Sequence, residues 1–368
     1  MYFVVSAGGT AGHINPAIAV ADELRRRGHR ILFAGTPNHI EAKLAVEAGF
    51  DFKGFEVAGF DAAKPWTLLS SGSKILKATS QAKALFRADR PDAVLTFGAY
   101  VSIPVGRAAA AMGIPLVIHE QNSVPGMANK YLAKKAQVTA LTYRESAAYL
   151  QCKNEPVVIG NPVRASFETC SRQRGRQLLG IPEDATVVLV FGGSLGAQHL
   201  NSAVAAMKES LLALPGVHVV HGAGKADYQA TADKLQLTDE ERRRWHLFEY
   251  IDQMGDVLAA SDLVVSRAGA SSLAEIMTLG VPAVLVPYPF ARGDHQTLNA
   301  AGCVAAGAAC LVPDAQVEEP AFAQLVLDLA SNPQRRATMA AACSQFSGST
   351  ARAKLADIAC ELTERSDS

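Results

Sequence analysis

Hydrophobic and polar positions follow a strand, loop, helix order that is clearest at the start of the chain. Tyr2 to Ser6 form a short aromatic and β-branched run, and three glycines follow between Gly8 and Gly12. Apolar residues then recur from Ile14 to Leu24 at the spacing of one helix face. Arg25 to Gly28 predict the end of this helix, because cations and a glycine suit a helix carboxyl terminus. The next strand is expected at Ile31 to Ala34.

The same order recurs along the chain and predicts an α/β protein. Helical stretches separate the short apolar runs, which is typical of parallel sheets covered by helices. After the turn-like Gly160-Asn161-Pro162 the order begins again, with a strand, a glycine loop at 192–197 and a helix. We therefore predict two doubly wound parallel-sheet domains. Further strands are expected at Ala93–Phe97, Leu116–His119, Val157–Ile159, Val187–Phe191, Val217–His221, His246–Glu249, Leu263–Ser266, Ala283–Val286 and Cys310–Val312.

The repeated order also suggests domain boundaries. We place the first domain at residues 1–162, the second at 163–340 and a terminal helical segment at 341–368, which we expect to pack back on the first domain. Open α/β sheets bind ligands at the carboxyl ends of their strands. If these edges face each other, the ligand site lies in an interdomain cleft.

Composition narrows the class of protein. The 368 residues are 49% hydrophobic and 19% charged, which excludes a disordered chain. No apolar run approaches the roughly 18 residues that span a bilayer, and no basic segment precedes the first apolar run as in a secretory signal. We therefore expect a cytoplasmic protein. Six scattered cysteines without a CxxC pair fit reduced thiols better than disulfides or a zinc site.

The net charge of zero hides an asymmetry between the two halves. Residues 1–162 carry 18 Lys and Arg against 12 Asp and Glu, and residues 163–368 carry 17 against 23. A basic first half suits an anionic partner such as a membrane surface or a pyrophosphate. The alternative is that these extra cations only lie on the solvated surface. Nucleic acid is not an expected partner, because no basic cluster is interleaved with aromatic residues.

The glycine loops favour a diphosphate ligand held without a metal. Residues 7–12 read Ala-x-Gly-x-x-Gly, but Gly35-Thr36-Pro37 stand where a dehydrogenase would place its ribose-binding acid. No P-loop and no Asp-x-Asp pair occurs in the sequence. A diphosphate would then be held by backbone N–H groups at the helix starts after 192–197 and near Ala270, and by the guanidinium of Arg164.

A third stretch has the chemistry of a sugar-nucleotide pocket. Arg267 to Glu275 read RAGASSLAE and open a helix after a strand. Ser271 and Ser272 can cap the helix and donate, while Glu275 can accept the two hydroxyls of a ribose diol. A plain capping role for Glu275 is the alternative. Asp294, His295, Gln296 and Asn299 add donors and acceptors suited to sugar hydroxyls.

Eight stretches match, in order, the pattern of one known family. They are GGTAGHINP (8–16), FGAYVSIP (97–104), HEQNSVPG (119–126), GNPVR (160–164), GGSLGA (192–197), YID (250–252), RAGASSLAE (267–275) and DHQTLNA (294–300). At these residues the chain resembles the bacterial MurG family of GT-B glycosyltransferases. The resemblance implies transfer of N-acetylglucosamine (GlcNAc) from UDP-GlcNAc to the undecaprenyl-linked muramoyl-pentapeptide acceptor (lipid I), giving lipid II for peptidoglycan. It implies no cofactor and no metal.

The resemblance assigns roles to individual residues. His13 is the candidate general base for the C4 hydroxyl of the acceptor, in a direct, inverting displacement; a merely hydrogen-bonding histidine is the alternative. Glu120 would orient the acceptor or His13, or else only satisfy backbone N–H groups of its loop. Arg164 and Ser194 would stabilise departing UDP. Leu195 takes a place that is often Gln in the family. The implied UDP-GlcNAc contacts are Thr10, Ala11, Gly12, Asn122, Arg164, Ser194, Ile251 (through its backbone), Ala270, Ser271, Ser272, Leu273, Ala274, Glu275 and Gln296.

A basic, apolar segment is a candidate for membrane binding. Between Trp66 and Arg90, apolar residues lie among Lys74, Lys77, Lys83, Arg87 and Arg90. This pattern is typical of an interfacial helix on an anionic membrane, and equally of an amphipathic helix on its own sheet. With the lipid-linked substrate, it favours a peripheral protein on the cytoplasmic face of the inner membrane, where cell-wall synthesis proteins are candidate partners.

Other functions share this architecture. A UDP-GlcNAc 2-epimerase, a glycosyltransferase with a soluble acceptor and a noncatalytic nucleotide-sugar sensor would all have two such lobes, because function depends on the site and not on the fold. His13 separates them: a sensor has no need of a base, whereas a transferase does.

Overall fold

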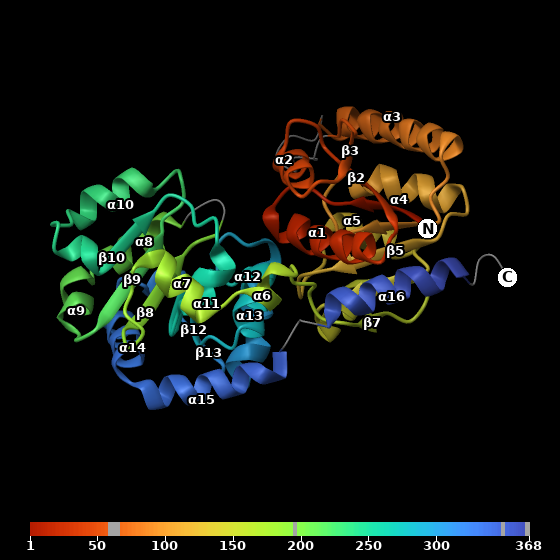
Figure 1. The fold of residues 1–368 in the computed structure, drawn as a ribbon. Helices are drawn as coiled ribbons and strands as arrows, with labels where there is room; N and C mark the ends of the chain where they lie inside the picture. The colour runs from red at the N-terminus through yellow and green to blue at the C-terminus, as the bar shows by residue number, and fades with distance from the viewer. Residues whose placement is uncertain (58–66, 194–196, 347–349, 365–368) are drawn as a thin grey trace. The chain divides into compact units, whose positions relative to one another are not determined.

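The computed structural model describes residues 1–57, 67–193, 197–346 and 350–364. The chain divides into two compact units (Figure 1). Unit 1 comprises Met1–Arg164 together with Ser349–Ser368, and unit 2 comprises Ala165–Gly348. Each unit is a parallel sheet covered by helices, which confirms the predicted α/β class.

Unit 1 is built on a seven-stranded parallel sheet in the order β3-β2-β1-β4-β5-β6-β7. The order reverses between β1 and β4, so the loops that follow these two strands diverge and leave a crevice at the carboxyl edge, as in other doubly wound sheets. The strands are β1 (Tyr2–Ser6), β2 (Arg30–Gly35), β3 (Asp51–Gly54), β4 (Ala93–Thr96), β5 (Leu116–Glu120), β6 (Val138–Leu141) and β7 (Val157–Val158).

Helices cover both faces of this sheet because alternate strand residues point to opposite sides. Phe3 and Val5 of β1 belong to one core cluster with α1, α2 and α16, and Tyr2 and Val4 belong to another with α3, α4 and α5. The helices are α1 (Ala11–Arg26), α2 (Ile40–Glu47), α3 (Thr67–Ala88), α4 (Ser102–Ala111), α5 (Met127–Leu132), the 3-10 helix η1 (Arg144–Tyr149) and α16 (Ala351–Glu364).

The terminal helix α16 is joined to α1 by a buried ion pair. The guanidinium Nε of Arg352 donates to Glu23 at 3.2 Å, and both side chains are almost fully buried. Arg352 also donates to the carbonyl of Val163 at 3.4 Å, while Arg27 pairs with Asp357 at 2.6 Å. Unit 1 therefore contains the two ends of the chain.

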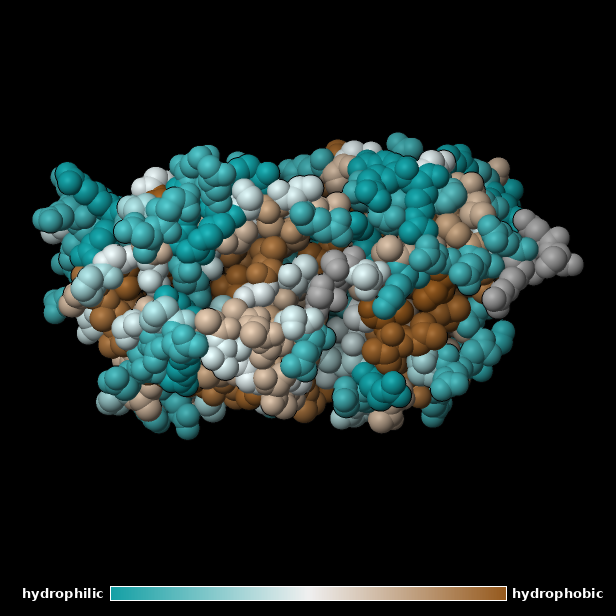
Figure 2. Space-filling view, turned by 60° about the horizontal axis from the view of Figure 1, so that its bottom comes forward, coloured by the Kyte–Doolittle hydropathy of each residue, from teal (hydrophilic) through white to brown (hydrophobic). Residues whose placement is uncertain are grey.

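The edge strand β7 leaves apolar surface exposed. Val157 and Val158 are partly exposed, and Val157, Val138, Ile358 and Leu362 line a hollow of about 160 Å³ beside α16. Figure 2 brings the side of α16 and β7 forward, and hydrophobic residues gather there in a brown area. The two-residue length of β7 limits the open hydrogen-bonding edge that a longer strand would present.

Unit 2 repeats the plan with a six-stranded parallel sheet in the order β10-β9-β8-β11-β12-β13. Its strands are β8 (Thr186–Phe191), β9 (Val217–Gly222), β10 (Trp245–Phe248), β11 (Leu263–Ser266), β12 (Ala283–Leu285) and β13 (Ala309–Leu311). Its helices are α6 (Ser166–Thr169), α7 (Arg172–Leu179), α8 (Gln198–Ala205), α9 (Lys208–Ala213), α10 (Tyr228–Leu235), α11 (Met254–Ala260), α12 (Ala270–Thr278), α13 (His295–Ala305), α14 (Pro320–Ser331) and α15 (Pro333–Cys343), with 3-10 turns η2 (Glu241–Arg243), η3 (Arg292–Asp294), η4 (Asp314–Gln316) and η5 (Ser344–Phe346).

Two strands of unit 1, β3 and β6, are not among the predicted strands, although the sequence of β6 is mostly apolar and mostly buried. In β3 a polar residue alternates with Phe52 and the strand ends in glycine, because it lies at the sheet edge and buries only one face in part.

Among the residues that the structure describes, no helix is long and apolar enough to cross a membrane.

Helix α7 packs so closely on α11 that Gly175 has no room for a side chain. A Cβ there would lie 2.0 Å from the carbonyl oxygen of Asp256 and 2.8 Å from Cβ of Ala260. We predict that Gly175→Ala lowers the free energy of unfolding by about 1–3 kcal/mol, because a backbone atom must move. Urea denaturation measures this change.

Gly302 of α13 is the matched control for this prediction. A Cβ at Gly302 would make an ordinary contact, at 3.7 Å from Phe346. Gly302→Ala should therefore stabilise by about 0.5–1 kcal/mol, as expected for Gly to Ala inside a helix. Equal effects of the two substitutions would contradict the close packing of α7 on α11.

Candidate functional site

The loop after β1 places His13 in the first turn of α1. Gly9 has a φ of +82°, so the chain can turn sharply before Thr10 begins the helix. The hydroxyl of Thr10 lies 3.2 Å from Nδ1 of His13. When Nδ1–H donates to this hydroxyl, Nε2 carries the lone pair, which is the state that a general base needs. The backbone N–H groups of Ala11 and Gly12 belong to the same first turn.

The loop after β4 fixes the position of the His13 ring. Gly98 has a φ of +95°, and a Cβ there would lie 2.9 Å from Cδ2 of His13. Only glycine admits the ring at this distance. The hydroxyl of Ser102 donates to the Gly98 carbonyl and so ties this loop to the start of α4.

Glu120 organises the loop after β5. Its Oε1 accepts from the backbone N–H of Asn122 at 2.9 Å, and Oε2 accepts from Gly126 N–H at 3.1 Å and from Nδ2 of Asn129 at 2.9 Å. Burial raises the pKa of this carboxyl, and these N–H donors oppose the rise without cancelling it. The contacts are those of a carboxylate that satisfies its own loop, which was the alternative to an orienting role, and they set the position of Asn122.

A buried histidine that the sequence did not single out connects this loop to the Gly160–Arg164 segment. Nε2 of His119 lies 3.0 Å from the Gly160 carbonyl, and Nδ1 lies 3.1 Å from Nε2 of Gln121. Burial lowers the pKa of His119 to about 4, so the ring is neutral and can donate from one nitrogen while accepting at the other. Arg164, the last residue of the first segment of unit 1, is partly buried.

The glycine loop of unit 2 precedes α8. Gly193 has a φ of +95°, whereas Ser194 and Leu195 lie outside the described residues. Behind the loop, Oδ1 of Asn201 in α8 accepts from Nε2–H of His221 at 3.1 Å, and Nδ2 of Asn201 donates to the Ala223 carbonyl at 2.8 Å. Burial lowers the pKa of His221 to about 3, so it stays neutral. This buried link, also missed from sequence, holds α8 against the carboxyl end of β9.

The start of α12 places the amino end of a helix beside a shielded carboxylate. Gly269 is the N-cap, Ala270 is nearly buried, and Ser271, Ser272 and Ala274 are partly exposed. Leu273 is part of the core and can reach a ligand only through its backbone. Glu275 is 9% exposed, one turn into the helix. A helix amino terminus attracts anions, and a shielded carboxylate beside it can accept hydroxyl donors from a sugar.

Gln296 holds together the loops that follow β11 and β12. Its Oε1 accepts from the N–H groups of Ala268 at 3.2 Å and Tyr288 at 2.9 Å. Because the oxygen is occupied, the amide NH₂ is the group that Gln296 can offer to a ligand. Buried Arg267 supports the same loops through Asp314 and through the carbonyls of Val286 and Pro287, both at 3.2 Å.

Ile251 lies with its side chain in the core. Its Cδ1 is 3.1 Å from where a Cβ on Gly222 would stand, so it covers the end of β9. A ligand could contact this residue only through the backbone. Within the described part of the chain, no group of three or more His, Cys, Asp or Glu side chains is arranged to hold a metal ion.

Comparison with known proteins decides the family. Residues 3–141 match the glycosyltransferase family 28 N-terminal domain and residues 187–359 the C-terminal domain. The chain is 38% identical to the UDP-N-acetylglucosamine--N-acetylmuramyl-(pentapeptide) pyrophosphoryl-undecaprenol N-acetylglucosamine transferase of Desulfitobacterium hafniense, over 93% of this chain and 94% of that protein. It is 36% identical to the enzyme of that name from Halothermothrix orenii, over 97% and 98%. The crystal structure of Acinetobacter baumannii MurG aligns with a TM-score of 0.76 at 28% identity, over 98% and 99%.

The chain belongs to the MurG family of glycosyltransferases. This confirms the family and the enzyme class predicted from the eight sequence stretches, an N-acetylglucosaminyltransferase of peptidoglycan synthesis. Within that family, the structure gathers the expected residues at the carboxyl edge of each sheet. Unit 1 carries Thr10 to His13, Glu120 and Asn122, and unit 2 carries Ile251, Ala270 to Glu275 and Gln296.

The segment expected to bind a membrane is divided between core and surface. Phe86 is buried with Ala78 and Ala82, so it faces the sheet of unit 1. Leu76 is 59% exposed, and Lys74, Lys77, Arg87 and Arg90 are also exposed. Trp66 lies outside the described residues. Over the residues of α3 whose side chains the structure describes, the exposed face therefore carries basic side chains together with Leu76.

Proposed function

We propose that this chain transfers GlcNAc from UDP-GlcNAc to the C4 hydroxyl of the muramoyl sugar of undecaprenyl-linked lipid I, with inversion and without a metal. The proposal is supported by the names of the relatives and by the site residues that each unit places at its carboxyl edge. The single observation that carries it is made within each unit by itself: in unit 1 the Thr10 hydroxyl lies 3.2 Å from Nδ1 of His13, and in unit 2 the carboxylate of Glu275 is shielded at the start of α12.

Unit 2 holds the donor in this proposal. Glu275 accepts the ribose hydroxyls, and the amino end of α12 receives the diphosphate at the N–H groups of Ala270, Ser271 and Ser272, with Leu273 and Ala274 completing that turn. Gln296 donates its NH₂ to the GlcNAc hydroxyls, and the backbone of Ile251 reads the uracil edge. Asn122 of unit 1 contacts the donor sugar, and Ala11 and Gly12 contribute the N–H groups beside it.

The chemical step is a direct displacement at the anomeric carbon. Nε2 of His13 takes the proton of the acceptor hydroxyl as its oxygen bonds to C1, and the bond from C1 to the UDP oxygen breaks. Attack opposite the leaving group converts the α-linked donor to a β-linked product. UDP departs with added negative charge, which Arg164, Ser194 and the helix ends stabilise.

We also propose that α3 brings unit 1 to the anionic cytoplasmic face of the inner membrane, where the acceptor lies. The exposed cations Lys74, Lys77, Arg87 and Arg90 support this, because each Lys or Arg near such a surface contributes about 1 kcal/mol. Exposed Leu76 adds apolar contact. Cell-wall synthesis proteins at that membrane are the proposed partners.

Because the diphosphate is held by N–H groups and a guanidinium, transfer should persist without divalent ions. We expect the rate of labelled GlcNAc transfer to a lipid I analogue to change less than about twofold in excess EDTA, since chelation removes none of these groups. Loss of activity that added Mg²⁺ restores would contradict the metal-free proposal.

His13→Ala should separate binding from catalysis. We expect the turnover rate to fall by about a hundredfold or more, the usual contribution of a general base, while the Kd for UDP-GlcNAc stays unchanged. His39→Ala, at an exposed histidine of the same unit, is the control and should transfer normally. Full turnover by His13→Ala would exclude its assignment as the base, and normal donor binding without any turnover in the wild type would identify a sensor.

Glu275→Ala tests the donor site by itself. We expect affinity for UDP-GlcNAc to fall by about tenfold or more, because two hydroxyl hydrogen bonds to a charged group are lost, while acceptor affinity is unchanged. Separate binding titrations with donor and acceptor measure this, with Glu240→Ala, at an exposed glutamate of unit 2, as the matched control. Equal weakening of both ligands would argue against the ribose contact.

A further inference from the structure

A polar cavity lies at the amino end of the unit 2 sheet, the opposite end from the donor-binding edge. It has a volume of about 380 Å³. Asp262 precedes β11 and Pro282 precedes β12, so these two residues mark the cavity as belonging to the amino ends of the strands. Its lining residues are Arg172, Ala259, Ser261, Asp262, Leu279, Gly280, Val281, Pro282, Pro333, Arg336, Ala337 and Ala340.

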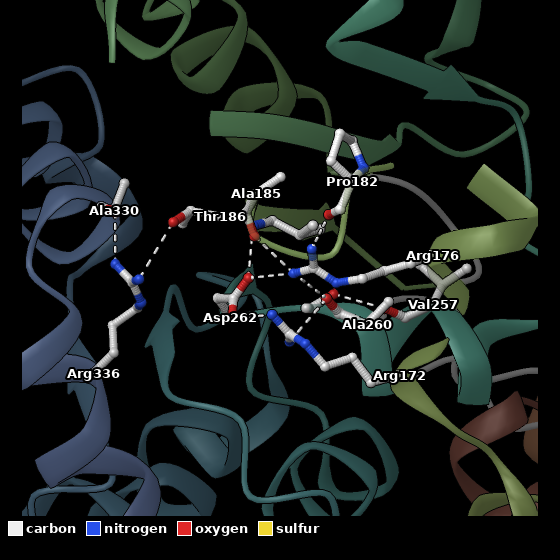
Figure 3. Close-up of polar contacts among 12 residues, drawn as sticks. Arg172, Arg176, Pro182, Ala185, Thr186, Val257, Ala260, Asp262, Ala330 and Arg336 are labelled. Carbon is white, nitrogen blue, oxygen red and sulfur yellow. Dashed lines mark hydrogen bonds and ion pairs between the residues drawn. The ribbon is translucent and has the colours of Figure 1, made fainter. Parts of the chain in front are cut away.

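Beside this cavity, the carboxylate of Asp262 accepts hydrogen bonds from two guanidinium groups. Oδ1 of Asp262 accepts from Arg172 at 2.8 Å, and Oδ2 accepts from Arg176 at 3.0 Å (Figure 3). Oδ2 also accepts from the backbone N–H of Val187 at 2.8 Å. Asp262 is the single carboxylate among the lining residues that the structure describes. Its charge is therefore shared between two cations.

Arg336 brings a third guanidinium, and its partners are neutral. It donates to the carbonyls of Leu329 at 2.7 Å and Ala330 at 2.6 Å, and to the Thr186 hydroxyl at 3.4 Å. Within the described part of the chain, no carboxylate forms an ion pair with it. Figure 3 shows Arg336 and Arg172 on two sides of Asp262.

The environment of these arginines disfavours their positive charge. Burial lowers the pKa of Arg336; Asp262 opposes this effect, and the nearby charge of Arg172 adds to it. Burial also lowers the pKa of Arg176, and the charge of Arg172 adds to this effect, whereas the carboxylates of Asp262, Glu183 and Asp184 oppose it. Of the described residues that line the cavity, Arg172 and Arg336 are cations and Asp262 is the carboxylate, so two guanidiniums face one carboxylate beside the open space, and a bound anion would balance their charge.

We propose that this cavity is a binding site for a phosphate-type oxyanion, held by Arg172 and Arg336. Guanidinium groups match the geometry of phosphate oxygens and form charge-assisted hydrogen bonds with them. The other walls are Leu279, Val281, Pro282 and alanines of α15, which leave space for a small organic group on the phosphate. Free phosphate and a phosphate monoester both present the oxygens that these guanidinium groups would bind.

The rival explanation is that the three arginines only join elements of the fold. Arg336 links α15 to α14 and β8, and Arg176 links α7 to the start of β8, so their removal would destabilise unit 2 under either explanation. Ala337 provides a test that leaves these links in place. It is exposed on α15, lines the cavity, and can be extended without touching a hydrogen bond of the cluster.

The test is isothermal titration calorimetry, in which inorganic phosphate is added to the full chain in a low-salt buffer and the heat of binding is measured. We expect saturable binding of phosphate to the wild type. Ala337→Glu should weaken this binding by about tenfold or more, because the new carboxylate offsets the positive charge of the arginines and occupies part of the cavity. The uncharged Ala337→Gln should bind phosphate nearly as tightly as the wild type. Arg172→Gln should weaken binding similarly. Arg243→Gln, which removes an exposed cation elsewhere in unit 2, should not.

A second titration with glycerol phosphate distinguishes the sources of the ligand. Binding of both compounds with the same dependence on position 337 identifies a site for esterified phosphate, and binding of inorganic phosphate alone identifies a site for the free ion. Two results would overturn the proposal. One is no saturable binding of either compound to the wild type. The other is binding that Ala337→Glu and Ala337→Gln leave equally intact, which would place the phosphate at the donor edge.

Discussion

The close approach of side chains to backbone at the carboxyl ends of parallel strands is the constraint on which the site depends. Every strand of a parallel sheet ends at the same edge, so the loops that carry Thr10, Asn122 and the start of α12 are brought to two edges by topology alone. Topology does not aim a side chain, however. Gly98, with its positive φ and missing Cβ, lets the ring of His13 lie against the next loop, and Gly222 does the same for Ile251. A methyl group at either place would displace the residue that it contacts.

Buried polar links give these loops a single arrangement. Glu120 accepts from N–H groups of its own loop, His119 bonds the Gly160 carbonyl, and Gln296 accepts from the loops after β11 and β12, which removes the cost of burying those groups unpaired. Burial also makes these side chains harder to ionise. It raises the pKa of Glu120 and lowers the pKa of His119, so the charged state of each is disfavoured. His13 differs from both, because it is partly exposed in the first turn of α1 and its Nδ1 lies 3.2 Å from the Thr10 hydroxyl.

The loops of the site could be predicted from the sequence, whereas the buried side chains that hold these loops in place could not. Glycine loops, helix starts and the order of strands follow from local pattern, so the two sheets and the position of His13 could be predicted. Strand β3 could not, because an edge strand with one partly buried face loses the apolar run. The links from His119 to Gly160 and from His221 to Asn201 join residues 41 and 20 positions apart, and no local signal reports such a pair. The same limit applies to the hydrogen bonds of Glu120 with Asn122, Gly126 and Asn129, while its orienting role stays a prediction.

Net charge and local charge diverge in unit 2. Residues 163–368 carry six more acids than bases, and on that ground an anion would be expected to avoid this half of the chain. Yet Arg172 and Arg336 both line the cavity at the amino end of the sheet, where Asp262 is the one carboxylate among the described lining residues. Screening in salt confines the field of exposed acids to about 10 Å, while partly buried guanidiniums act at contact distance in a less polarisable medium. The sign of the charge that an anion meets at this cavity is therefore set by the arginines around it and not by the net charge of the domain.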